Sequence, residues 1–169
     1  MATFLDLFEV STAHPLLLAL LDLDITEQQW KEFSTWLESY ILRRAVCGWT
    51  TKGYNRIFLT LTRALSRDGA SLPQLVAALS EQAGESAEWP SDEAFSEDFR
   101  TRHAYRTLNN AKIVHVLKRL NETHFDAKME AIAIEGSLTV EHLMPQAWIE
   151  HWPLPDGSTG MELLGDTRN

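Results

Sequence analysis

The sequence predicts a mainly α-helical protein, in which a multi-helix domain is followed by a short β-containing segment. Apolar residues recur at spacings of three and four through most of the first 130 residues, which is the period of an amphipathic helix. From about residue 129 the pattern changes to alternation, in MEAIAIEGSLTVEHL, and then to HWPLPDGSTG, which is rich in proline and glycine. We therefore expect a helical domain at 1–130 and a separate segment at 131–169.

The helices are expected from their apolar stripes and from the signals at their ends. HPLLLALLDL begins the first helix, with a proline in its first turn, where proline is tolerated. Thr26 and Gln29 then form the pattern of a capping box, and Gly48 is a natural stop. Ser71 is the expected cap of a later helix. The predicted helices span about 14–23, 27–46, 54–67, 72–83, 91–102 and 109–121.

Composition limits the classes of protein to which this chain can belong. The formal net charge is −9, whereas non-specific nucleic-acid binding requires clustered lysine and arginine. Any DNA contact must therefore be local or supplied by another part of the protein. Cys47, the single cysteine, excludes a disulfide framework and a thiolate zinc site within the chain. It fits a cytoplasmic location, and we expect a plain buried residue. The longest apolar run, PLLLALL, is too short to cross a membrane, so no membrane partner is expected.

The stretch LTVEHLMPQAW, residues 138–148, carries the candidate site. Apolar and polar residues alternate at its start as in a strand, and Pro145 breaks the chain soon after Glu141 and His142. A neutral histidine can take a proton from water as a general base. A carboxylate oxygen suits a hard cation such as Mg²⁺, which polarises a phosphate and stabilises the departing oxygen. Neighbouring strand residues point to opposite faces, so the strand must end or twist here to aim both side chains at one site.

These residues resemble the first strand and turn of the HNH, or His-Me finger, nucleases, in which an acid and a histidine precede two apolar residues, a proline and often a glutamine. The resemblance to the C-terminal nuclease domain of GmrSD-type, modification-dependent restriction enzymes is closer still. Two further stretches are similar to that family in order and spacing: WLESYILRRAVCGWTTKGYNRIF at 36–58 and AYRTLNNAKIVHVLKRLNE at 104–122. The resemblance covers roughly residues 30–169.

The resemblance implies that His142 is the general base and Glu141 a metal ligand, while Pro145 and Gln146 shape the turn. It implies a divalent metal, Mg²⁺ or Mn²⁺, and DNA as the substrate of the intact enzyme. It also implies a missing N-terminal domain that resembles ParB-type nucleotidases, and a nucleotide is expected in that domain alone. The family's second strand and its Asn- or His-bearing helix are not visible in this sequence. We therefore expect a truncated chain with an incomplete ββα segment that is inactive by itself.

Other interpretations stay open at this point. The chain could be a helical protein–protein interaction module without catalysis, or a nuclease domain that has lost its chemistry and kept a binding role. His142 could simply pack at a strand end. For Arg43 and Arg44, the favoured interpretation is that one pairs with an acid across helices while the other is solvated. Lys112 and the residues KRL at 118–120 form a small basic face that is a weaker candidate for DNA contact.

Overall fold

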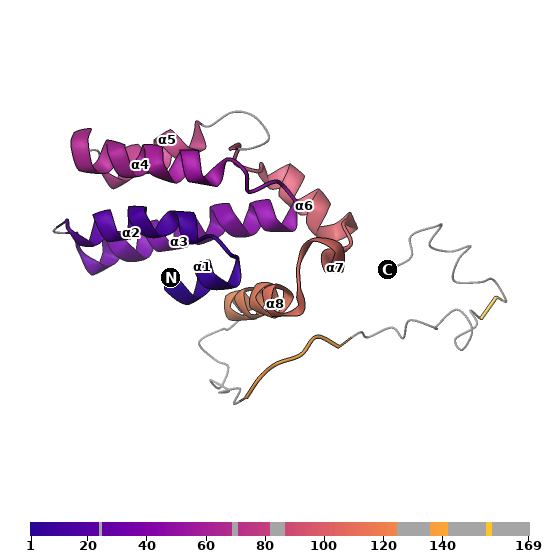
Figure 1. The fold of residues 1–169 in the computed structure, drawn as a ribbon. Helices are drawn as coiled ribbons and strands as arrows, with labels where there is room; N and C mark the ends of the chain where they lie inside the picture. The colour runs from indigo at the N-terminus through magenta and orange to yellow at the C-terminus, as the bar shows by residue number, and fades with distance from the viewer. Residues whose placement is uncertain (24, 69–70, 82–86, 125–135, 142–154, 157–169) are drawn as a thin grey trace. The chain divides into compact units, whose positions relative to one another are not determined.

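The computed structural model describes residues 1–23, 25–68, 71–81, 87–124, 136–141 and 155–156. The chain divides into two units, Met1–His124 and Phe125–Asn169. The first unit consists of helices (Figure 1), so the mainly helical fold predicted from the sequence is confirmed for the described residues. The predicted domain boundary at residue 130 lies outside the described residues and stays a prediction.

The helical unit has nine short or long helical elements in its described part. In chain order they are α1 (Ala2–Leu7), the 3-10 turn η1 (Ser11–Ala13), α2 (His14–Leu21), α3 (Glu27–Val46), α4 (Tyr54–Asp68), α5 (Leu72–Ser80), α6 (Asp92–Thr101), α7 (Ala104–Thr107) and α8 (Asn110–His124). The sequence did not predict α1, η1 and α7, because elements of three to six residues are too short to show a helical period.

The longest helix, α3, begins and ends as its sequence predicts. At its start the Thr26 hydroxyl accepts from the N–H of Gln29 at 3.2 Å, and the Gln29 side chain accepts from the N–H of Thr26 at 2.9 Å. At its end Gly48 has a φ of +65°, and the N–H of Trp49 donates to the carbonyl of Arg44 at 2.9 Å. A left-handed residue followed by this backward hydrogen bond is the Schellman ending, which favours glycine.

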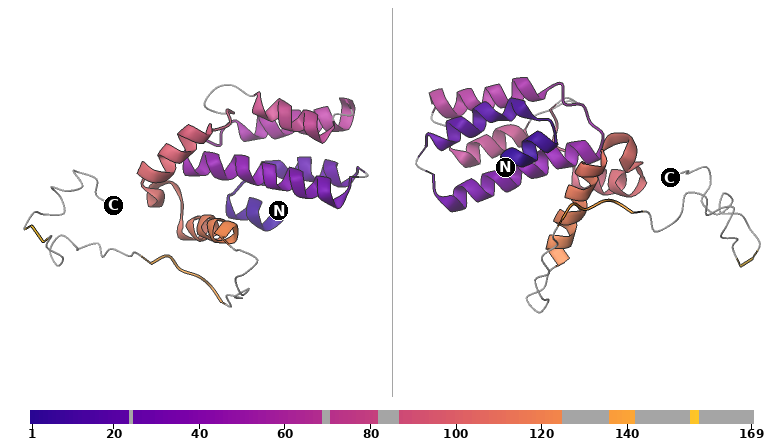
Figure 2. Two further views of the ribbon diagram at one scale, coloured as in Figure 1. Left: turned by 180° about the vertical axis from the view of Figure 1, so that it is seen from behind. Right: turned by 60° about the horizontal axis from the view of Figure 1, so that its bottom comes forward.

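The core of the unit lies around α3. This helix packs against α5, α6 and α7, while α4 packs chiefly against η1, α2 and α5. The views in Figures 1 and 2 agree that α4 and α5 lie on one side of α3 and α8 on the other. The largest apolar side chains that are fully buried are Leu5, Leu16, Leu20, Phe33, Leu37, Tyr40, Ile41, Phe58, Leu61, Leu75 and Leu79.

Two stretches of the second unit are described, 136–141 and 155–156. Gly136 has a φ of +102°, and residues 137–141 form neither a helix nor a paired strand. The β-containing part predicted at 131–169 is therefore not seen in these described residues, and most of it lies outside them. Among the described residues no helix is long and apolar enough to cross a membrane.

Candidate functional site

The structure describes the predicted catalytic pair only in part. Glu141 is exposed and is the last residue of the described stretch 136–141. His142, Pro145 and Gln146 lie outside the described residues, so the geometry of the pair and its turn stays a prediction. Elsewhere in the described part of the chain, no three His, Cys, Asp or Glu side chains gather as they must to hold a metal ion. Glu141 is therefore the one predicted site residue that the structure describes, and its role as a metal ligand stays a prediction.

The adjacent arginines near the C-terminal end of α3 have two different roles. Arg43 Nη1 lies 2.6 Å from Asp92 Oδ1, so the prediction that one arginine pairs with an acid across helices is confirmed. The prediction that the other is solvated is wrong, because Arg44 is fully buried. Residues three and four apart share a helix face, and the buried side chains of Tyr40 and Ile41 place Arg44 on the same face.

The Arg44 guanidinium joins two segments that are distant in sequence. Nη1 donates to the carbonyl of Glu88 at 2.6 Å, and Nη2 donates to the carbonyl of Thr50 at 2.6 Å. Three aromatic rings lie around the guanidinium carbon at 5.4 to 5.5 Å from their centroids, those of Tyr40, Trp49 and Tyr54. Burial raises the pKa of the Tyr54 hydroxyl, and the charge of Arg44 partly offsets that rise. Arg44 therefore connects the turn after α3 to the loop before α6.

Neighbouring residues of α3 hold the same loop. The Tyr40 hydroxyl donates to the carbonyl of Ala87 at 2.8 Å, and Trp36 stacks on Trp89 with ring centroids 5.4 Å apart and planes 29° apart. Arg43 Nη1 also donates to the carbonyl of Pro90 in this loop at 3.3 Å. The described residues 87–91 are thus fixed to α3 immediately before α6 begins.

A histidine and a carboxylate meet where α8 packs near α3. His115 Nε2 lies 3.0 Å from Glu38 Oε1, and Arg119 Nε lies 3.0 Å from the same oxygen. A histidine oriented by a carboxylate is the arrangement of a general base. Here, however, the ring also contacts Phe4 and Phe8, with centroids 5.2 and 5.7 Å away. The cluster therefore attaches α8 to α1 and α3, and among the described residues it is not part of a group that could hold a metal ion.

The small basic face predicted on the last helix is largely neutralised by carboxylates. Lys112 Nζ lies 2.8 Å from Glu9 Oε2, and this ion pair lowers the pKa of Glu9. Arg119 pairs with Glu38 and with Glu122. Lys112 and Arg119 of this basic face thus already form ion pairs within the fold, so the face is a poor binding site for a polyanion.

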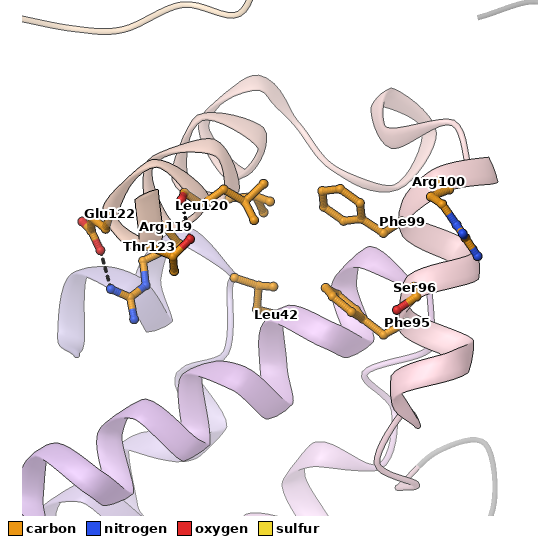
Figure 3. A pocket seen from close by; sticks show the side chains of 10 residues that line it. Leu42, Phe95, Ser96, Phe99, Arg100, Arg119, Leu120, Glu122 and Thr123 are labelled. Atoms are coloured by element: carbon orange, nitrogen blue, oxygen red, sulfur yellow. Dashed lines mark hydrogen bonds and ion pairs between the residues drawn. The ribbon is translucent and has the colours of Figure 1, made fainter. Parts of the chain in front are cut away.

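An apolar groove of about 740 Å³ lies between α3, α6 and α8. Figure 3 shows Phe95 and Phe99 of α6 facing Leu120 of α8, with Leu42 of α3 between them. Phe99 is 42% exposed and Leu120 is 40% exposed. The lining includes two hydroxyls, Ser96 and Thr123, but no histidine or cysteine, and most of its surface is apolar. The groove therefore suits the binding of an apolar side chain better than catalysis. Its signal in the sequence is the spacing of four between the two phenylalanines.

Cys47, at the end of α3, is buried as predicted. Burial raises the pKa of its thiol to about 11, and contact with the carboxylate of Asp98 acts in the same direction. Because the thiolate is the reactive form of cysteine, Cys47 is not a nucleophile near neutral pH.

Comparison with known proteins finds one family model that matches part of the chain. Residues 89–167, slightly less than half of the chain, match the model of a family described as GmrSD restriction endonucleases, C-terminal domain. The match includes the stretches 104–122 and 138–148, and it confirms the resemblance stated above over these residues. The stretch 36–58 lies outside the matched range. No curated protein and no solved structure matches the chain.

Proposed function

We propose that the chain is part of a restriction endonuclease that hydrolyses phosphodiester bonds in foreign or modified DNA, because residues 89–167 match the model of the GmrSD restriction endonuclease C-terminal domains. The family match is the observation that carries this proposal. The acid–histidine motif within the matched range adds chemical support, since phosphodiester hydrolysis requires an activated water.

Glu141 and His142 are the reacting residues in this proposal. His142 accepts a proton from the attacking water, because water is a poor nucleophile at neutral pH. Glu141 is a ligand of a divalent cation, and its carboxylate is exposed and not held in a helix. Pro145 and Gln146 shape the turn that aims the two side chains at one phosphate.

The proposed cofactor is Mg²⁺ or Mn²⁺, and Glu141 fits it as one ligand. Mg²⁺ commonly keeps several waters and is held by one or two carboxylates together with substrate phosphates. The cation supplies charge stabilisation to the departing oxygen. Glu141 is the one protein ligand proposed, at the low end of that range, so we expect weak metal binding and little or no DNA cleavage by the 169-residue chain by itself.

The proposal extends to the remaining parts of the enzyme. Residues 131–169 contribute to a ββα-type segment, and residues 1–130 form a helical domain that precedes it. A nucleotide is bound in an N-terminal domain outside this sequence. The enzyme acts in the cytoplasm, where invading DNA is met and where a single reduced cysteine is stable.

Cleavage of plasmid DNA by the intact enzyme, with nucleotide and with Mg²⁺ or Mn²⁺, tests the proposal. General-base catalysis contributes roughly 100- to 10,000-fold, so His142→Ala is expected to slow cleavage by about that factor, and Glu141→Gln to raise the metal concentration that cleavage requires. His103→Ala, at a half-buried histidine outside the motif, is the matched control and is expected to cut normally. Equal cleavage by the wild type and by folded His142→Ala contradicts the assigned roles.

A second candidate function is favoured by one observation, the apolar groove between α3, α6 and α8. In this alternative the helical unit is an interaction module without catalysis, and the groove accepts an apolar side chain of a partner domain. The cleavage assay separates the two functions. A folded intact protein that cuts no DNA with either metal contradicts the nuclease and leaves the interaction module.

A further inference from the structure

The charge of this chain is distributed unevenly, and one long stretch contains no acid. The whole chain has 24 acidic and 15 basic residues, yet residues 39–67 contain no Asp or Glu and six Lys or Arg residues. Two of the six, Arg43 and Arg44, are engaged inside the fold. The other four lie in the turn before α4 and on α4 itself: Lys52, Arg56, Arg63 and Arg67.

The three arginines form one exposed stripe on α4, and Lys52 is exposed in the turn before it; we call these four residues the α4 basic face (Lys52, Arg56, Arg63 and Arg67). Each of these residues is exposed. At 3.6 residues per turn and 1.5 Å per residue, the three arginines fall within about 40° around the helix axis and span about 16 Å along it. The buried residues Ile57, Leu61 and Leu65 lie on the other side of the helix. The face is therefore straight, continuous and turned to solvent.

The elements that pack against α4 bring no carboxylate to this face. They are η1, α2 and α5, and none of them contains Asp, Glu, Lys or Arg. Among the described residues, none of the four cations forms an ion pair. Because α4 and α5 form the outer layer on one side of α3 (Figure 1), a large ligand can approach. The positive charge of the α4 basic face is thus not neutralised within the described fold.

A row of guanidinium groups suits a row of phosphates. The planar fork of arginine pairs with phosphate oxygens through two hydrogen bonds, and backbone phosphates receive most protein–DNA hydrogen bonds. Asn55, Thr60 and Ser66 are also exposed on α4 and add short polar side chains beside the arginines. On a chain of net charge −9, such a local cluster is the arrangement that allows an acidic protein to hold a polyanion.

We propose that the α4 basic face binds the phosphodiester backbone of double-stranded DNA. The choice of duplex DNA rests on the proposed function, since a restriction endonuclease must hold this polyanion. The contact positions the duplex without reading its sequence, because phosphates carry no base information. The face lies outside residues 89–167, which match the family of C-terminal domains, so the binding surface is distinct from the proposed reacting residues.

The test measures how the affinity of the full-length protein for a fluorescein-labelled duplex depends on salt, by fluorescence anisotropy without divalent metal. Each phosphate contact contributes about 0.9 to the slope of log affinity against log salt. The variant Arg56→Gln/Arg63→Gln/Arg67→Gln is expected to have a slope shallower by about 2.7 and, at about 0.15 M salt, an affinity lower by on the order of 100-fold. Glutamine has nearly the helix propensity of arginine, and a circular dichroism spectrum checks that α4 folds.

Two further variants separate a local contact from a change in net charge. Lys31→Gln/Arg106→Gln/Lys118→Gln removes the same charge from exposed residues of α3, α7 and α8 and is expected to keep the wild-type slope. Replacing the three α4 arginines with lysine keeps the charge and is also expected to keep the slope. If the triple glutamine variant does not fold, Arg63→Gln alone is expected to reduce the slope by about 0.9.

An unchanged slope in the α4 variant, or an equal reduction in the control variant of α3, α7 and α8, overturns the proposal. Tighter binding of single-stranded RNA or of anionic vesicles through the same residues also overturns it, since the face then serves another polyanion. The outcome is distinguishable from that of the proposed function. His142→Ala is expected to lose cleavage and keep the slope, so a protein that binds through α4 but never cuts contradicts the nuclease and supports the binding face.

Discussion

Replacing Arg44 with methionine is expected to destabilise the helical unit by about 3 kcal/mol. The change is chosen because Arg44 is fully buried and donates to the carbonyls of Glu88 and Thr50 at 2.6 Å each. Methionine is an unbranched, flexible side chain that fills irregular core space, but it donates to neither carbonyl. The variant therefore tests the polar contacts of Arg44 and disturbs the packing little.

The magnitude follows from two opposing terms. A hydrogen bond from a charged donor contributes roughly 1.5–3 kcal/mol, so the loss of two such bonds removes about 3–6 kcal/mol. Methionine also avoids the desolvation of a buried guanidinium, which costs several kcal/mol before its contacts are counted, and this offsets part of the loss. A net loss of about 3 kcal/mol is a large share of the roughly 5–15 kcal/mol that stabilises a typical domain.

The neighbouring arginine provides the matched control. Arg43 pairs with Asp92, whose side chain is 81% exposed, and exposed ion pairs contribute about 0–1 kcal/mol. Arg43→Gln is therefore expected to cost less than about 1 kcal/mol. Urea unfolding followed by circular dichroism measures both variants, with an unchanged m-value showing that stability alone has changed. Equal losses in the two variants, or an Arg44→Met variant as stable as the wild type, refute the reasoning.

Two further predictions concern the end of α3. Gly48→Ala is expected to lower the free energy of unfolding by about 1–3 kcal/mol, because a left-handed conformation costs an L-residue roughly 1–2 kcal/mol and the new Cβ meets Thr107 Cγ2 at 2.9 Å. A thermal melt checks this, and an unchanged Tm contradicts it. Burial raises the pKa of the Cys47 thiol from 9.0 to about 11, so the folded state holds this proton more tightly than the unfolded state. That stabilisation is present below pH 9 and is lost as pH rises from 9 through 11. In urea unfolding across this range Cys47→Ala is expected to show a smaller loss of stability with pH, and equal pH dependence in both proteins contradicts the assignment.

Much of the fold could be predicted from the sequence because its signals are local. The capping box of Thr26 and Gln29, the cap at Ser71 and the stop at Gly48 each depend on residues within a few positions of one another. The helical spacing of apolar residues then predicts the long helices. It does not give α1 or α7, which have six and four residues and take their conformation from tertiary contacts.

Arg44 shows where local signals fail. Its spacing from Tyr40 and Ile41 places it on the buried face, but an arginine there is ordinarily interpreted as solvated. One of its acceptors, the carbonyl of Glu88, lies 44 residues away in sequence. No local pattern indicates which carbonyls will meet a side chain across that distance, so the burial of this charge could not be predicted.

The candidate site, too, could be predicted where its signal is local in the sequence. Glu141 and His142 are adjacent, so the motif can be recognised without knowledge of the fold, although their roles stay predictions. The α4 basic face was overlooked for the opposite reason. The net charge of −9 is a sum over the whole chain. It therefore does not reveal residues 39–67, in which every charged side chain is positive.

The range matched by the family model does not coincide with the compact units of the structure. The match begins at residue 89, inside the unit Met1–His124. Trp89 stacks on Trp36, and α8 is joined to α3 by the pair of His115 and Glu38 at 3.0 Å. Residues 89–124 thus find these partners on α3, so the first part of the matched range cannot be separated from that helix. Under the two proposals made above, the helical unit holds the DNA backbone and the residues after 124 carry out the chemistry.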